Sequence, residues 1–202
     1  MPTPTVLSQA AGRVVTGYST PVVALYTVND GSVVYSNAKT LARGVSVEVS
    51  PESSDATIFY ADNVAAETAP GRFTGGEVTL TVDGLNPDAE KMIMGLPDPS
   101  SDGFTYYNDD QSIPYVGVGW ITRYMSGGVT FYTPEGLCKV AFNPIDRSAE
   151  TQEEEIDFQT QELTANIMRD DSAKHAWRFF GGDYSTEADA ATALRSLLAG
   201  TH

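Results

Sequence analysis

The sequence predicts a mainly β fold with two short helices. Three observations lead to this prediction. Apolar and polar residues alternate through several segments, which is the pattern of a strand with one buried face. The chain of 202 residues has ten tyrosines and eight phenylalanines, together with many valines and threonines, all of which favour strands. Eighteen glycines and eleven prolines supply frequent turns.

The N-terminal part is expected to be a flexible arm followed by a hairpin. Residues 1–20 are polar, with Gly, Ser, Thr and Pro among a few valines, which is typical of a frayed chain end. Strands are predicted over 22–28 and 33–35, because Asp30-Gly31 between them is a strong signal for a two-residue hairpin turn.

Two strands with clean alternation, 44–50 and 77–83, enclose a long polar connection over 51–76. Such a loop is rare in a compact domain unless it has a function or is disordered. It carries its own hydrophobic run, Ile58-Phe59-Tyr60, so we expect an extended arm that grips a neighbouring molecule. The apolar residues that each strand is expected to turn toward a core are Val45, Val47, Val49, Val78, Leu80 and Val82.

Two helices are predicted from their caps and apolar stripes. The first covers about 86–96, with Asn86 as its N-cap and Pro87 in the first helical position. The second covers about 186–199 and begins at Thr186, whose spacing to a following aspartate resembles a capping box. The apolar stripes are formed by Ala89, Met92, Ile93, Leu96, Ala190, Leu194, Leu197 and Leu198.

A second block of strands follows an acidic loop over 98–111. Turns are predicted at 126–128, which contains two glycines, and at 133–136, which contains Pro and Gly. The two β blocks are candidates for the halves of one sandwich. We expect one β domain over 21–170 and a C-terminal extension over 171–202. The strands predicted in this second half are 116–124, 129–132, 138–143, 156–168 and 176–180.

The chain is strongly acidic, with 27 acidic against 12 basic residues, a formal charge of −15 and an isoelectric point near 4.3. This balance argues against nucleic acid as a bound ligand, because affinity for phosphate rises with Lys and Arg. It is compatible with a surface past which DNA slides without binding. The first residues do not resemble a signal peptide, and no window of about 18 residues is apolar enough to span a membrane. We therefore expect a protein made in a reducing cytoplasm, without a membrane partner.

Nothing in the sequence predicts catalysis, and no cofactor or metal is expected. His175 is not accompanied by the Gly-x-Ser-x-Gly motif that would support a catalytic triad. The segment 98–103 has the oxygen density of a calcium loop but not the EF-hand pattern, which leaves a weak cation site open. Cys138 alternates with apolar neighbours and is expected to be a buried strand thiol.

The order of several β segments resembles the major tail proteins of long, flexible-tailed bacteriophages, the siphophages. The likeness covers roughly 20–170 and lies in the order of soft β patterns rather than in a catalytic signature. The segments are Leu-Tyr-Thr-Val at 25–28, Gly-Val-Ser-Val-Glu-Val-Ser-Pro at 44–51, Phe-Tyr-Ala-Asp-Asn at 59–63, Glu-Val-Thr-Leu-Thr-Val at 77–82, Tyr-Val-Gly-Val-Gly-Trp at 115–120 and Asp-Phe-Gln-Thr-Gln-Glu-Leu-Thr-Ala at 157–165.

The resemblance implies the tail-tube fold, a β-sandwich or barrel flanked by a helix. It implies a virion protein, assembled in the bacterial host cytoplasm, whose hexameric rings stack into a hollow tube for DNA delivery. The implied partners are other copies of the chain and the tape measure, tail tip and tail terminator proteins, while genomic DNA passes through without specific binding. The long loop would reach a neighbouring subunit through Ile58, Phe59, Tyr60, Arg72 and Phe73. Candidate acids for the lumen, equally plausible as ordinary surface residues, are Glu48, Glu77, Asp83 and Glu155.

Two other interpretations are open at this point. One is an acidic β-sandwich that binds carbohydrate through a platform of Tyr106, Tyr107, Trp120 and Tyr124. Trp120 and Tyr124 alternate with valines, however, which favours their burial in the core. The other is the tube protein of a contractile injection or secretion device. Sugar binding by a monomer would favour the first interpretation, and rings or tubes would favour either kind of tube.

Overall fold

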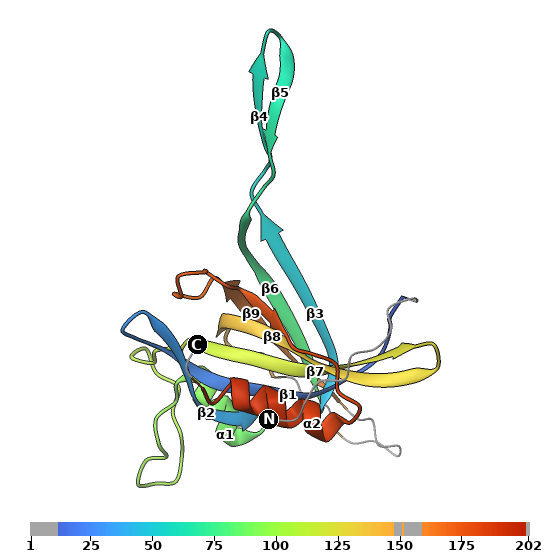
Figure 1. Cartoon of the computed structure of the whole chain (residues 1–202). Helices are drawn as coiled ribbons and strands as arrows, with labels where there is room; N and C mark the ends of the chain where they lie inside the picture. The colour runs from blue at the N-terminus through green and yellow to red at the C-terminus, as the bar shows by residue number, and fades with distance from the viewer. Residues whose placement is uncertain (1–11, 148–150, 152–158, 201–202) are drawn as a thin grey trace.

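The computed structural model describes residues 12–147, 151 and 159–200. The fold is mainly β, as predicted. Seven strands follow one another in a single antiparallel sheet in the order β2-β1-β7-β8-β9-β6-β3, β10 adds to β8, and β4 and β5 pair only with each other (Figure 1). The elements are β1 Val14–Asn29, β2 Ser32–Thr40, β3 Gly44–Ser53, β4 Thr57–Ala61, β5 Val64–Ala69, β6 Phe73–Val82, α1 Pro87–Met94, β7 Val116–Ser126, β8 Val129–Phe142, β9 Gln161–Met168, β10 Arg178–Phe180 and α2 Glu187–Leu197.

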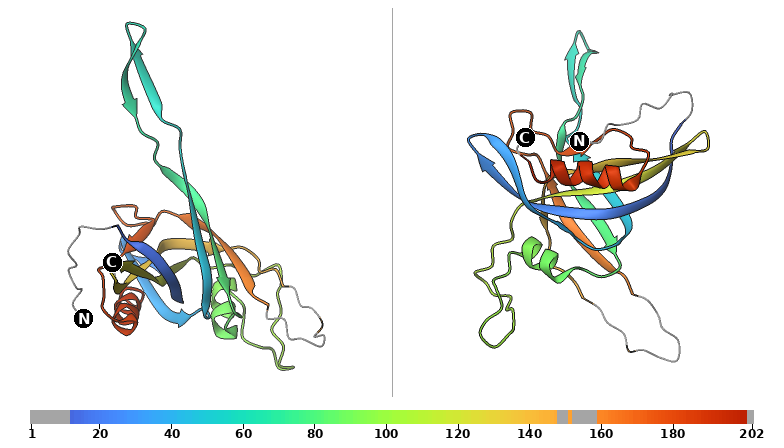
Figure 2. Two further views of the ribbon diagram at one scale, coloured as in Figure 1. Left: turned by 90° about the vertical axis from the view of Figure 1, so that its right-hand side faces the viewer. Right: turned by 60° about the horizontal axis from the view of Figure 1, so that its bottom comes forward.

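The sheet curls, so that β3 packs on β1 although the two are not hydrogen-bonded neighbours (Figure 2). The two predicted β blocks are therefore interleaved rather than separate, because β1 pairs with β7 and β6 pairs with β9. The interior of the curl holds the main core, which α1 closes through its apolar stripe. The largest fully buried side chains of this core are Trp120, Leu41, Leu80, Ile93, Met94, Leu137, Leu163 and Ile167.

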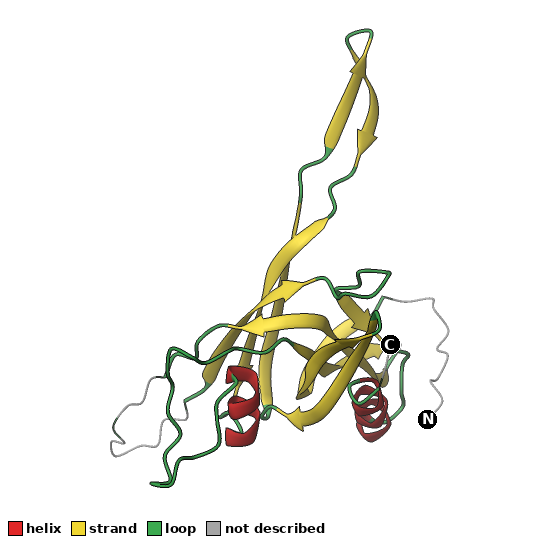
Figure 3. Ribbon diagram, turned by 90° about the vertical axis from the view of Figure 1, so that its left-hand side faces the viewer, coloured by secondary structure: helices red, strands yellow, loops and turns green. Residues whose placement is uncertain are grey.

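A second, smaller core lies on the outer face of β1 and β7, where α2 covers the sheet. Ala190 and Leu194 of α2 pack against Val22, Ala24 and their neighbours. Figure 3 shows the two helices on opposite sides of the lower strands. The C-terminal segment is thus built into the body of the protein through α2 and through the pairing of β10 with β8.

The predicted hairpin turns are confirmed. Asp30 and Gly31 have φ of 48° and 76°, and Gly127 and Gly128 have φ of 57° and 80°. Left-handed backbone at both central residues is the geometry of the two-residue turn that matches the twist of paired strands. The strands they join are longer than predicted.

Two boundaries differ from the prediction. β1 begins at Val14, so the part of the expected arm from Val14 onward is paired with β7, while residues 1–11 lie outside the described residues. The predicted turn at 133–136 is wrong, because β8 runs through it. A Cβ at Gly136 would lie 2.2 Å from the carbonyl oxygen of Val118, so this glycine permits close strand approach rather than a turn.

Both helices begin as predicted. The Asn86 side chain accepts a hydrogen bond from the Asp88 N–H at 3.0 Å, and that of Thr186 accepts one from the Asp189 N–H at 3.2 Å. Gly95, with φ of 62°, ends α1 two residues before the expected stop at Pro97. The predicted strand over 156–168 begins at Gln161, and its first part lies largely outside the described residues.

Candidate assembly surfaces

The long connection over 51–76 is a β-hairpin arm rather than an irregular loop. β3 continues to Ser53 and β6 starts at Phe73, and β4 and β5 pair beyond them. Asp62 and Asn63 form the turn at the end, with φ of 50° and 63°. Figure 1 shows this arm projecting far from the body. The turn pair flanked by Phe-Tyr-Ala and Val-Ala-Ala is the sequence signal that could have revealed the hairpin.

The end of the arm, which we call the tip (β4, β5 and their turn), exposes apolar side chains. Every residue of β4 and β5 is exposed, and the exposed fractions of Phe59, Tyr60 and Val64 are 63%, 62% and 65%. An isolated two-stranded hairpin is marginally stable in water. Apolar side chains that cluster on the surface, as they do on this tip, are typical of a contact surface. The predicted interface residues Ile58, Phe59 and Tyr60 lie together in β4.

The other two predicted interface residues lie apart from the tip, at the base of the arm. The Phe73 ring stacks on Trp177, with centroids 4.5 Å apart and planes at 5°. The Arg169 guanidinium lies 5.9 Å from the Phe73 ring and also donates to its carbonyl oxygen. The Arg72 N–H donates to the Ser54 hydroxyl at 3.1 Å. Phe73 therefore anchors the arm to the body.

The outer side of β3, β6 and β9 forms an acidic face. Strand register places Glu48 and Glu77 on this side together with Glu162, while Val78 and Leu80 point into the core. These three strands contain no Lys or Arg. Small polar residues also lie on this side, and they are Ser46, Ser50, Thr79, Thr81, Thr164 and Asn166.

Of the four predicted lumen acids, two are placed on the acidic face. Glu48 and Glu77 share the acidic face, but Asp83 forms an ion pair with Arg43 and accepts a hydrogen bond from its N–H at 3.0 Å. Although desolvation opposes it, the bonding and charge of Arg43 lower the pKa of Asp83. Glu155 lies outside the described residues. Glu162, which the prediction omitted, is signalled by the alternation of β9.

The outer edge of β3 is the end of the sheet path. Within the described part of the chain, no backbone hydrogen bond is made along this edge. A register shift next to Gly44 displaces Val45, which is 54% exposed, so its predicted place in the core is wrong. A ten-residue strand with a free edge is a template for pairing with another chain.

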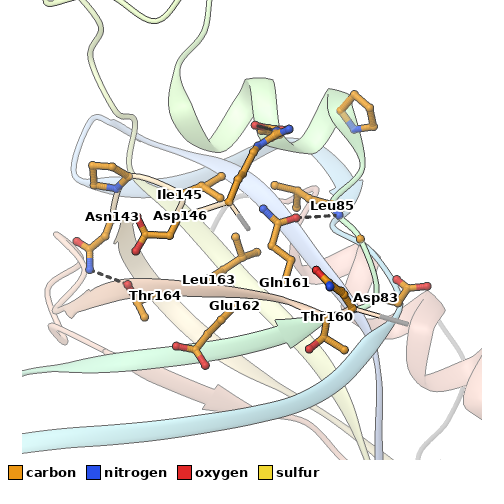
Figure 4. Close-up of a pocket in the computed structure, with 16 residues that line it drawn as sticks. Asp83, Leu85, Asn143, Ile145, Asp146, Thr160, Gln161, Glu162, Leu163 and Thr164 are labelled. Carbon is orange, nitrogen blue, oxygen red and sulfur yellow. Dashed lines mark hydrogen bonds and ion pairs between the residues drawn. The ribbon is translucent and has the colours of Figure 1, made fainter. Parts of the chain in front are cut away.

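A polar cavity of about 720 Å³ lies between α1, the segment after β8 and β9 (Figure 4). Its polar groups bond to one another: the Asn143 amide donates to Thr164 at 3.0 Å, and the Leu85 N–H donates to Gln161 at 3.4 Å. Glu90, at its wall, accepts from Tyr107 at 2.8 Å and forms an ion pair with Arg147. Glu90 and Asp83, two of the carboxylates that line the cavity, are thus each held by an arginine of their own, Arg147 and Arg43.

The predicted carbohydrate platform is not assembled. Trp120 is 2% exposed within the main core, whereas Tyr106 and Tyr107 are on the surface. The Tyr124 hydroxyl donates to Glu135 at 2.6 Å, and desolvation together with this bond raises the pKa of Tyr124 to about 12. The four rings therefore do not present one flat surface to a sugar.

Cys138 and the acidic loop before β7 are two further candidates for reactive groups in the sequence. Cys138 is buried as predicted, and desolvation raises its pKa to about 12. Asp102 accepts from Ser100, Tyr106 and the Phe104 N–H, which lowers its pKa to about 2. Over the described residues, no group of three His, Cys, Asp or Glu side chains is placed to hold a metal ion.

No known protein family model matches the chain, and no curated protein matches it either. Among the helices that the structure describes, none is both long and apolar enough to cross a membrane.

Proposed function

We propose that this protein is a structural virion protein whose copies assemble into stacked hexameric rings, forming the hollow tail tube of a long-tailed bacteriophage. The observation that carries the proposal is the arm, a hairpin that projects from a well-packed body and exposes Phe59, Tyr60 and Val64. Among the described residues, the apolar side chains of the tip do not pack into a core of their own chain. A neighbouring subunit supplies the surface that covers it.

The free edge of β3 supports the same function. Pairing of this edge with a strand of the next subunit would continue the sheet from copy to copy and remove an aggregation-prone edge from solvent. Around a ring, the acidic face of each copy would then join those of its neighbours.

The acidic face fits a passage for DNA. Glu48, Glu77 and Glu162 repel phosphate, and the absence of Lys and Arg from β3, β6 and β9 leaves no group there to bind it. Turned toward the lumen, this face would let DNA slide through without specific contacts. The tape measure, tail tip and tail terminator proteins would be the other partners of such a tube.

Negative-stain electron microscopy over a concentration series, paired with sedimentation velocity, tests the proposal. We expect rings or hollow tubes of uniform diameter that increase with protein concentration. A protein that stays monomeric at every concentration, including in the presence of a tail tip complex, would contradict it. Sugar binding by that monomer would favour the carbohydrate-binding interpretation instead.

A further inference from the structure

A second cavity, of about 520 Å³, lies at the body end of the arm between the start of β1, β8 and β10. Its walls are unusual for this acidic chain. They combine the aromatic rings of Tyr124, Trp177 and Phe180 with the guanidinium groups of Arg13 and Arg178. We call it the arginine–aromatic pocket. Aromatic and arginine side chains in a pocket are the combination that most often dominates protein–protein binding energy.

The arginines of the pocket are fixed in place by buried carboxylates. Arg178 donates to Glu135 at 2.8 Å, and Arg13 donates to Asp183 at 2.8 Å. Each arginine side chain is 41% exposed, whereas the side chains of Glu135 and Asp183 are 8% and 10% exposed. The surface that an incoming group meets is therefore formed by the guanidinium groups rather than by the acids beneath them.

The pocket is preorganised by further contacts. The Tyr124 hydroxyl donates to the second oxygen of Glu135, and the Thr133 hydroxyl donates to Asp183 at 2.7 Å. Arg13 also lies 5.6 Å above the Tyr124 ring. Side chains that are already held before binding lose little further freedom when a partner docks.

We propose that the arginine–aromatic pocket of one copy receives the tip of the arm of a second copy. The tip offers matching chemistry: Phe59 and Tyr60 are exposed rings, and Asp62 and Glu67 are its charged groups, with no Lys or Arg between 57 and 69. Rings of the tip would enter among the rings of the pocket, and its acids would face the guanidinium groups. This inference rests on the proposed function, because it specifies one contact by which copies join.

The tip cannot fill the pocket of its own chain. Trp177 lines the pocket and also stacks on Phe73, where the arm leaves the body. The turn at Asp62 stands roughly 30 Å beyond Ser53 at about 3.3 Å per residue. Figures 1, 2 and 3 show the arm pointing away from the body. Each copy thus carries a tip and a pocket at opposite ends of one arm. Docking is heterologous and propagates from copy to copy.

Disulfide trapping between two proteins that each carry one introduced cysteine tests the contact. One protein carries Phe59→Cys, and the other carries Phe180→Cys at a position that is 78% exposed, with a tag to distinguish their masses. Cys138 can stay, because burial makes its thiol unreactive. Oxidation of the mixture is expected to give a heterodimer on a non-reducing gel. The double variant in one chain is expected to give a ladder of higher oligomers.

The matched control is Phe104→Cys, at 65% exposure in the loop before β7, mixed with Phe59→Cys. Circular dichroism checks that each variant is folded. Equal trapping at positions 104 and 180, or no trapping at 180 at any concentration, would overturn the proposed contact. Rings or tubes without the 59–180 product would overturn this contact alone and leave the tube function standing. The 59–180 product without rings or tubes would instead support the contact and count against the tube.

Discussion

The paired strands of the arm have two regions with opposite surroundings. Near the body, Val78, Leu80 and Val82 of β6 are 0% exposed, whereas at the tip every residue of β4 and β5 is exposed. Backbone pairing continues through most of both regions, so hydrogen bonding does not distinguish them. Burial does. The body end stabilises the fold, and the tip is left available for a partner, so substitutions in the two regions should have separable effects.

The largest loss of stability is expected from Leu80→Ala at the body end. The Leu80 side chain lies in the main core, and its removal leaves a cavity that costs about 3 kcal/mol of unfolding free energy. Urea denaturation followed by tryptophan fluorescence measures the change. Glu77→Ala, on the exposed face of the same strand, is the control and should shift the midpoint little. Equal losses for the two variants would contradict the division between the faces of β6.

A smaller loss is expected at the junction of the two regions, from Trp177→Ala. This change removes the ring that stacks on Phe73, and since Trp177 is only half-buried we expect a cost of about 2 kcal/mol. Thermal and urea denaturation measure it. Phe180→Ala, in the same short strand but 78% exposed, is the matched control. If Phe180→Ala costs as much, stacking on Phe73 is not what holds the arm base.

The sequence predicts the body end better than the tip, for a physical reason. Burial on one face imposes strict alternation, and so Val78, Leu80 and Val82 could be placed in the core from their spacing alone. At the tip no core imposes such an alternation, and Ala, Thr and Asp interrupt the apolar residues there. The hairpin there was consequently predicted as a loop.

Other differences arise from contacts between distant segments. Gly136 and the nearby Pro134 resemble a turn in the local sequence, yet β7 pairs with both and keeps β8 extended, and it approaches Gly136 too closely for a side chain. Phe73 and Trp177 are over a hundred residues apart in the chain, so their stacking, and with it the pocket, has no local signal. The ion pair between Asp83 and Arg43 likewise joins two loops, the one before β3 and the one after β6. Strand alternation alone predicts an exposed side chain for Asp83 and no partner for it.

A third prediction concerns the acidic face of β3, β6 and β9, on the opposite side of these strands from the main core. Replacing Glu48, Glu77 and Glu162 by Lys should leave the unfolding midpoint nearly unchanged, because all three side chains are exposed. It should also create measurable binding to double-stranded DNA at low salt, with a log–log salt slope of roughly 0.9 per phosphate contacted. Fluorescence anisotropy measures this binding. The triple Gln variant separates loss of repulsion from gain of attraction, and DNA binding by the unaltered protein at the same salt would contradict a non-adhesive face.

The smallest effect on stability, and the largest on assembly, is expected from Phe59→Ser with Tyr60→Ser at the tip. Both rings are more than half exposed, so their removal should change the unfolding free energy by less than about 0.5 kcal/mol. Rings or tubes should nevertheless disappear in negative stain, because the tip loses the apolar side chains that a second copy would cover. Phe104→Ser removes an equally exposed ring elsewhere and should assemble normally. Unchanged tubes from the tip variant would show that the exposed rings of the arm do not hold subunits together. A shared loss in both variants would indicate that any exposed ring contributes, and the distinction between tip and body would then not explain assembly.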